Sequence, residues 1–176
     1  ILDYLEELNR QTFLTVEYGI ESTNNDTLRR INRGHTFECS EKAINDTAER
    51  GIVTGGHIII GLPGELGEGI IRQAEKISAT KLDILKIHQL QIVRGTRLAE
   101  EYTQKPFHVF SADEYIRVVS EYIRHLRKDI VIERFVSQSP KGMLIAPDWG
   151  LKNYEFTNKL NNYLKENNIR QGELFT

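Results

Sequence analysis

Cysteine is almost absent from this sequence, since Cys39 is the only one among 176 residues. A lone thiol cannot form a disulfide within the chain, and this excludes the small secreted domains that disulfides hold together. A reducing compartment is the simpler environment for such a protein, so we expect a cytoplasmic location.

Long apolar runs and a strong net charge are missing as well. No stretch approaches the roughly 20 apolar residues that cross a bilayer, so no membrane partner is expected. The formal net charge of −2 gives no electrostatic reason to expect nucleic acid. The chain opens at Ile1 inside an amphipathic helical pattern, which predicts a fragment of a longer protein.

An apolar run that ends abruptly in Gly-Leu-Pro-Gly-Glu organises the rest of the chain, over residues 54–65. A β-branched run bounded by Gly and Pro is typical of a buried parallel strand. Because side chains alternate along a strand, the even positions form a wholly apolar face that suits packing under helices. The odd positions carry His57, Ile59 and Gly61, which suits a ligand-bearing interior with space at the glycine.

Strand and helix patterns alternate along the chain. Strands are predicted at about 12–21, 52–62 and 82–91, with a weaker one at 130–136. The order strand, helices, strand, helix, strand, helices predicts an α/β fold with parallel strands and right-handed crossovers. Ser111 and Glu114 form a capping box before a helix. We expect 137–149 to be irregular, 150–168 to be a polar helix and the tail 170–176 to be loosely held.

In a parallel sheet the carboxyl ends of the strands meet at one edge. This brings Glu21, His57 and His88 together, and Glu17 and Lys86 complete a possible pocket on the same faces. One interpretation is a metalloenzyme in which Glu21, His57 and His88 form a two-histidine, one-carboxylate site. The structural alternative is that each histidine is bonded to backbone and carries no chemistry.

Several segments taken together are more specific than any one alone. The runs Val16–Ser22, Asn25–Leu28, Ile31–His35 and Gly61–Glu65 resemble the second half of the radical SAM barrel. Their order is similar to the branch with the oxygen-independent coproporphyrinogen oxidases and the tRNA methylthiotransferases. Downstream, the runs 86–90, 95–98 and 144–149 resemble the YhcC-like radical SAM proteins.

This resemblance implies a fold and a chemistry. Residues 1–105 would form the C-terminal half of a (β/α)6 barrel, and 106–176 an extension packed on it. The family binds S-adenosylmethionine (SAM) against a [4Fe–4S] cluster. An electron, supplied by a flavodoxin or ferredoxin type of donor, cleaves SAM to a 5′-deoxyadenosyl radical that abstracts hydrogen from a substrate. The parent would be an Fe–S oxidoreductase of unknown substrate.

Four positions match the SAM contacts of the family. Glu21 would contact SAM, Arg33 would lie near its carboxylate, and Ile59 would lie against adenine. His57 stands where relatives have an Asp that holds the ribose. An imidazole forms one hydrogen bond at each nitrogen and cannot clamp a diol as a carboxylate does.

The cluster motif Cys-x3-Cys-x2-Cys of the family is absent from the sequence. Three thiolates are needed for a cluster whose fourth iron SAM can chelate, so we expect no metal ligand, no bound cofactor and no activity in this chain alone. A half barrel would leave the strand at 13–20 with an open edge, through which the chain is predicted to dimerise.

A third hypothesis is a non-catalytic α/β module that binds a partner through residues 137–176. The radical SAM interpretation is preferred to the metalloenzyme, which explains the histidines but neither the Asn-Arg-Gly-His segment nor the Gly-Leu-Pro-Gly-Glu turn.

Overall fold

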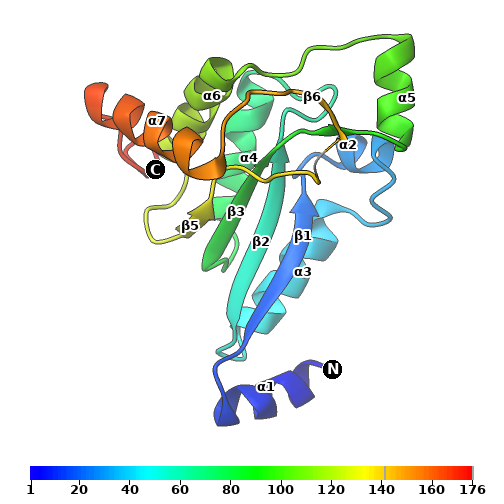
Figure 1. Ribbon diagram of the computed structural model, residues 1–176. Coiled ribbons are helices and arrows are strands. Elements are labelled where there is room, and N and C mark those ends of the chain that lie inside the picture. The colour runs from blue at the N-terminus through cyan, green and yellow to red at the C-terminus, as the bar shows by residue number, and fades with distance from the viewer. Residues whose placement is uncertain (141, 176) are drawn as a thin grey trace.

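A four-stranded parallel sheet forms the centre of the computed structural model, which describes residues 1–140 and 142–175. The strands follow the order β1-β2-β3-β5 across the sheet (Figure 1). They are β1 (Thr15–Glu21), β2 (Val53–Ile60), β3 (Ile84–Gln89) and β5 (Val131–Arg134). The α/β class and the parallel strands predicted from the sequence are confirmed.

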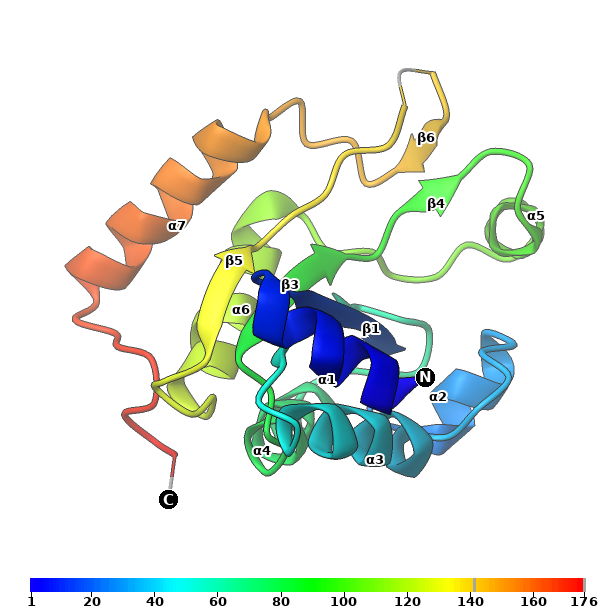
Figure 2. The same cartoon turned by 90° about the horizontal axis from the view of Figure 1, so that it is seen from below.

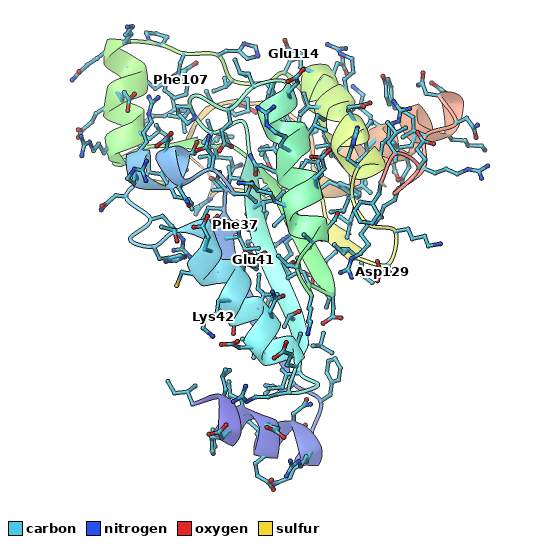
Figure 3. All side chains as sticks on the ribbon, turned by 180° about the vertical axis from the view of Figure 1, so that it is seen from behind. Phe37, Glu41, Lys42, Phe107, Glu114 and Asp129 are labelled. Atoms are coloured by element: carbon cyan, nitrogen blue, oxygen red, sulfur yellow. The ribbon has the colours of Figure 1, made fainter. Side chains whose placement is uncertain are left out.

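Helices α3, α4 and α6 lie over one face of the sheet, as the view from behind shows (Figure 3). The core between helices and sheet contains Ile58 and Ile60 of β2, which are fully buried. Burying such a side chain contributes about 1.5–3 kcal/mol. The predicted apolar face is therefore confirmed at Ile58 and Ile60, whereas Leu62, predicted on the same face, lies in a separate cluster with Leu90 and Ile92. The helices of the chain are α1 (Leu2–Gln11), α2 (Asn25–Arg30), α3 (Phe37–Ala48), α4 (Glu68–Ser78), α5 (Arg97–Gln104), α6 (Ala112–Arg124) and α7 (Asn153–Glu166).

The segment 137–149, predicted to be irregular, contains a strand, β6 (Leu144–Ala146). It pairs antiparallel with β4 (Ile92–Val93), and Figure 2 shows this pair on the opposite side of the sheet from α3 and α4. Two and three residues are too few to give a period-two pattern, so the sequence carried no signal for this pair. A second apolar cluster packs beside β4, made of Leu62, Leu90, Ile92 and Ala99.

Residues beyond 105 take part in the sheet, because β5 is its fourth strand. The division of the chain at residue 105 stays a prediction. The prediction of a loosely held tail is wrong for residues 170–175, and residue 176 lies outside the described residues. The backbone amides of Gly172 and Leu174 donate to the carbonyls of Ile123 and Arg124, at 2.9 and 2.8 Å. Bonds made by backbone amides leave no side-chain pattern in the sequence.

Within the described part of the chain, every helix is too short or too polar to cross a bilayer.

The capping box of α6 is confirmed. The Glu114 amide donates to Ser111 Oγ at 3.3 Å, and the Ser111 amide donates to Glu114 Oε2 at 2.8 Å. Ser111→Ala should lower the free energy of unfolding by about 0.5–2 kcal/mol, because the Glu114 amide loses its acceptor. Urea denaturation measures the loss. Ser111→Thr keeps the hydroxyl and should lose much less, so equal losses in the two variants would contradict the capping role.

Candidate functional site

Glu21 and Arg33 converge on Gly19 at the carboxyl end of β1. Arg33 Nε donates to the Gly19 carbonyl at 3.1 Å, and Arg33 Nη2 donates to the same oxygen. A Cβ placed on Gly19 would lie 2.6 Å from Arg33 Nη2 and 2.7 Å from Glu21 Oε1, so only glycine leaves room for both side chains. The structure thus brings together two of the four predicted SAM-binding residues.

His57 and Ile59 follow on β2, the neighbouring strand. Gly19 of β1 stands directly opposite His57 in the register. Ile59 is partly buried against the second apolar cluster, beside Leu62 and Leu90. Gly61 has φ +95°, and a Cβ there would meet the Phe110 ring at 3.1 Å, so the space at this glycine is used by Phe110. The expectation that Gly61 leaves space for a ligand is therefore wrong.

The sheet face that carries Glu17, His57, Lys86 and His88, which we call the polar face, is held by one shared carboxylate. Glu17 Oε2 accepts from His57 Nε2 at 2.8 Å, and Glu17 Oε1 accepts from Lys86 Nζ. Lys86 also lies 3.3 Å from Glu133 Oε1 of β5. The hydrogen bonds from Lys86 and His57 lower the pKa of Glu17, and the bond to Glu17 raises the pKa of Lys86. The pair is therefore ionised at neutral pH.

Gly55 makes this contact possible. It stands opposite Glu17 in the register of β1 and β2, and a Cβ on it would lie 2.9 Å from Glu17 Cγ. The Glu17 side chain therefore crosses β2 over a residue without a side chain and reaches Lys86 on β3. The sequence placed Glu17 and Lys86 in a pocket, but it gave no signal for Glu133.

His88 lies beside His57 on the polar face, with the two ring centroids 5.5 Å apart. Its Nε2 is buried and has no hydrogen-bond partner in residues 1–140 and 142–175. Burial, and then the positive charges of Arg134, His57 and Lys86, lower the pKa of His88 to about 4. His88 is therefore neutral at neutral pH.

The alternative metal site at Glu21, His57 and His88 is wrong. The described residues contain no group of three or more His, Cys, Asp and Glu side chains that could hold a metal ion. The Nε2 of His57 is turned toward Glu17. The register of β1 shifts between Gly19 and Glu21, so Glu21 stands opposite Ile58 and lies beside Arg33 at Gly19.

Glu65, at the end of the Gly-Leu-Pro-Gly-Glu turn, ties the two loops at the carboxyl ends of β1 and β2. It is 3% exposed and accepts hydrogen bonds from Ser22 Oγ and, at 2.7 Å, from Gln73 Nε2. Ser22 directly follows Glu21, and its Oγ also accepts from the amide of Asn24, which caps α2. Sequence reasoning missed this role, although a carboxylate directly after a turn between two buried segments was a signal for it.

Two protein-family models match this chain. The radical SAM superfamily model matches residues 1–77, and the Radical_SAM C-terminal domain model matches residues 82–166. This chain belongs to the radical SAM superfamily. The fold and the resemblance predicted from the sequence are thereby confirmed.

The relatives are longer proteins than this chain. The chain is 32% identical over 176 residues to the uncharacterized protein MJ0486 of Methanocaldococcus jannaschii, covering 99% of this chain and 55% of that protein. It is 29% identical over 175 residues to protein YhcC of Escherichia coli K12, covering 99% of this chain and 57% of that one. The chain thus spans about half the length of the curated relatives it matches.

Solved structures share the fold. The archaeal Elp3 of Methanocaldococcus infernus superposes with a TM-score of 0.82 at 22% identity, over 96% of this chain and 40% of that one. Methylornithine synthase (PylB) superposes with a TM-score of 0.54 at 14% identity, over 97% and 56%.

Replacing Glu65 tests its role in joining the loops. Glu65→Ala leaves the buried donors of Ser22 and Gln73 without an acceptor, which should cost about 2–4 kcal/mol of unfolding free energy. Glu68→Ala, in the exposed first turn of α4, is the matched control and should change it by less than about 0.5 kcal/mol. Urea denaturation gives both values, and a loss at Glu65 as small as the control would contradict the role.

The low pKa of His88, about 4, makes stability depend on pH. The unfolded chain, with a histidine pKa of ~6.5, binds more protons than the folded chain between the two values. Stability therefore rises with pH through this window and is lost as pH falls from about 6.5 toward 4, by at most about 3 kcal/mol.

Denaturation across this pH range measures the effect. His88→Gln removes the titrating group and should flatten the dependence relative to the unaltered chain. The same slope in both proteins would show that His88 is not responsible.

Proposed function

We propose that this chain is the C-terminal part of a radical SAM Fe–S oxidoreductase. The parent protein would cleave SAM reductively, and the resulting 5′-deoxyadenosyl radical would abstract hydrogen from its substrate. The observation that carries the proposal is the convergence of Glu21 and Arg33 over Gly19, next to His57 and Ile59 on β2. Membership of the superfamily supports it.

The residues of this chain do not fit the [4Fe–4S] cluster. Cys39 is exposed on α3 and is the one cysteine in the sequence, whereas three thiolates are required. We therefore assign the cluster to the part of the parent outside this chain, in keeping with relatives of nearly twice its length. The chain alone is expected to be inactive.

The proposed SAM contacts follow from the hydrogen bonds that are still available. Arg33 uses Nε and Nη2 on the Gly19 carbonyl, so Nη1 remains for the SAM carboxylate. Glu21 can accept from an ammonium or hydroxyl group, and Ile59 offers an apolar wall for adenine. His57 has Nε2 committed to Glu17, which leaves one nitrogen for the ribose.

Two partners belong to the proposal. The parent would take its electron from a flavodoxin or ferredoxin type of donor in the cytoplasm. β1 lies at one edge of the sheet. Unpaired edges bind other strands, so we propose that the isolated chain dimerises through residues 13–20.

The test uses the full-length parent, reconstituted with iron and sulfide without oxygen. We expect about four irons per chain, the composition of one [4Fe–4S] cluster, and release of 5′-deoxyadenosine from SAM under reducing conditions. Arg33→Ala and Glu21→Gln should each lower this release by about tenfold or more, because each removes a charged hydrogen-bonding group.

Arg29→Ala is the matched control, since Arg29 lies on α2 and pairs with Asp26 on the same helix. It should release 5′-deoxyadenosine as the unaltered parent does. A parent without cluster and without SAM cleavage would contradict the proposal and favour a non-catalytic module that binds through residues 137–176.

A further inference from the structure

A cavity lies between the carboxyl end of β3 and the start of α7, and none of the four proposed SAM contacts lines it. Gln89 follows His88 on β3, so its side chain lies on the opposite face of the sheet from His88. The volume of about 250 Å3 is slightly below the ~300–1,000 Å3 of sites for drug-sized ligands, so the cavity suits a smaller molecule. We call it the α7 cavity, and its lining includes Gln89, Gln91, Ser137, Gln138, Trp149 and Asn153.

Side-chain amides of two glutamines hold one wall of the α7 cavity in place. Gln89 Nε2 donates to the Ser137 carbonyl at 2.9 Å, and the Ser137 amide donates to Gln89 Oε1 at 2.9 Å. Gln91 Nε2 donates to the same carbonyl at 3.2 Å, and Ser139 Oγ donates to Gln91 Oε1 at 2.8 Å. The segment 137–139 is therefore fixed before a ligand binds, which lowers the entropic cost of binding.

Trp149 forms a flat apolar wall of the same cavity. Its Nε1 donates to the Phe110 carbonyl at 2.9 Å, so the polar atom of the indole is already used. Its ring stacks on the buried ring of Phe156, with the centroids 5.3 Å apart and the planes 20° apart. A ring of a ligand can pack against an indole held in this way, because aromatic rings attract one another in offset-stacked and edge contacts.

The hydrogen-bonding groups that remain for a ligand are neutral. Within residues 1–140 and 142–175, the side-chain amides of Gln138 and Asn153 and the hydroxyl of Ser137 make no hydrogen bond. Each side-chain amide offers two N–H donors and one carbonyl acceptor. A carboxamide on a ligand offers the same set, so it can donate to such an amide and accept from it at once.

The two charged side chains of the described lining have contacts of their own. Lys152 Nζ lies over the Tyr154 ring, 5.8 Å from its centroid. Asp148 Oδ1 accepts from the Gly150 amide at 3.0 Å. The two charges cancel in number, and neither calls for a charged ligand.

We propose that the α7 cavity binds a small uncharged molecule in which a carboxamide is joined to a flat ring. The ring packs on Trp149, and the carboxamide exchanges hydrogen bonds with the amides of Gln138 and Asn153. A carboxylate of the same shape is disfavoured, because it has no donor and adds a second negative charge beside Asp148. Binding breaks no covalent bond and involves neither SAM nor a cluster, so this proposal does not rest on the proposed function.

The experiment is a titration of the present chain with benzamide. Trp149 is the one tryptophan in the sequence, so tryptophan fluorescence reports the α7 cavity alone. We expect benzamide to change this fluorescence to a plateau. Benzoate has the same shape without a donor, and acetamide has the carboxamide without a ring, so each should bind about tenfold more weakly.

Variants locate the binding. Gln138→Ala and Asn153→Ala should each weaken benzamide by about fivefold, the effect of one lost hydrogen bond. Asn161→Ala is the matched control, since Asn161 lies on α7 outside the lining of the cavity and its loss should leave the affinity unchanged. Nitrogen-15 spectra of the unaltered chain need no variant, and benzamide should shift the side-chain amide signals of Gln138 and Asn153 but not that of Asn161.

Three results would overturn the proposal: a fluorescence change that rises without a plateau, equal affinities for benzamide and benzoate, or an equal loss of affinity in the control variant. None of these measurements needs a cluster or SAM. Failure here would leave the proposed SAM chemistry standing, and absence of SAM cleavage in the parent would leave the α7 cavity standing as a binding site.

Discussion

Burial of one face of a parallel sheet is the constraint on which the rest of this structure depends. Ile58 and Ile60 are fully buried under the helices. Because side chains alternate along a strand, His57 and Ile59 then have to lie on the other face. A slip of one residue in the pairing would bury His57 and expose the isoleucines, so the register that forms the core also sets the site.

The charges of the polar face are arranged so that they neutralise one another. A lysine that is 10% exposed is costly to desolvate unless carboxylates bond it, and Glu17 and Glu133 do so from two different strands. The same carboxylate of Glu17 also fixes the ring of His57. The carboxylate that offsets the desolvation of Lys86 therefore also defines which nitrogen of His57 is available to a ligand.

Much of the fold could be predicted because its main elements are long and periodic. The alternation in β2 and the capping box at Ser111 each have a local cause, and both were visible in the sequence. The paths that the side chains take across the structure were not visible in the sequence. Glu17 reaches Lys86, 69 residues away, only because Gly55 stands between them, and Glu65 meets Ser22 across 43 residues. Such contacts depend on how strands are placed in space, which no local pattern encodes.

The likeness to solved structures supports the fold and leaves the chemistry to the residues themselves. At 22% and 14% identity, Elp3 and PylB show how strands and helices are arranged, and a shared fold hosts many reactions.

The shared carboxylate also crosses a boundary in the sequence. Glu17 lies in the segment that matches the superfamily model, residues 1–77, whereas Lys86 and Glu133 lie in the segment that matches the C-terminal domain model, residues 82–166. A chimaera could join these segments from two relatives at the seam between them, residues 77–82, and would keep every helix and strand. It would still leave the nearly buried ammonium group of Lys86 with Glu133 alone, without the carboxylate of Glu17, unless both parents carried the same residues at these positions. Recombination at this seam is thus constrained by electrostatics rather than by chain connectivity.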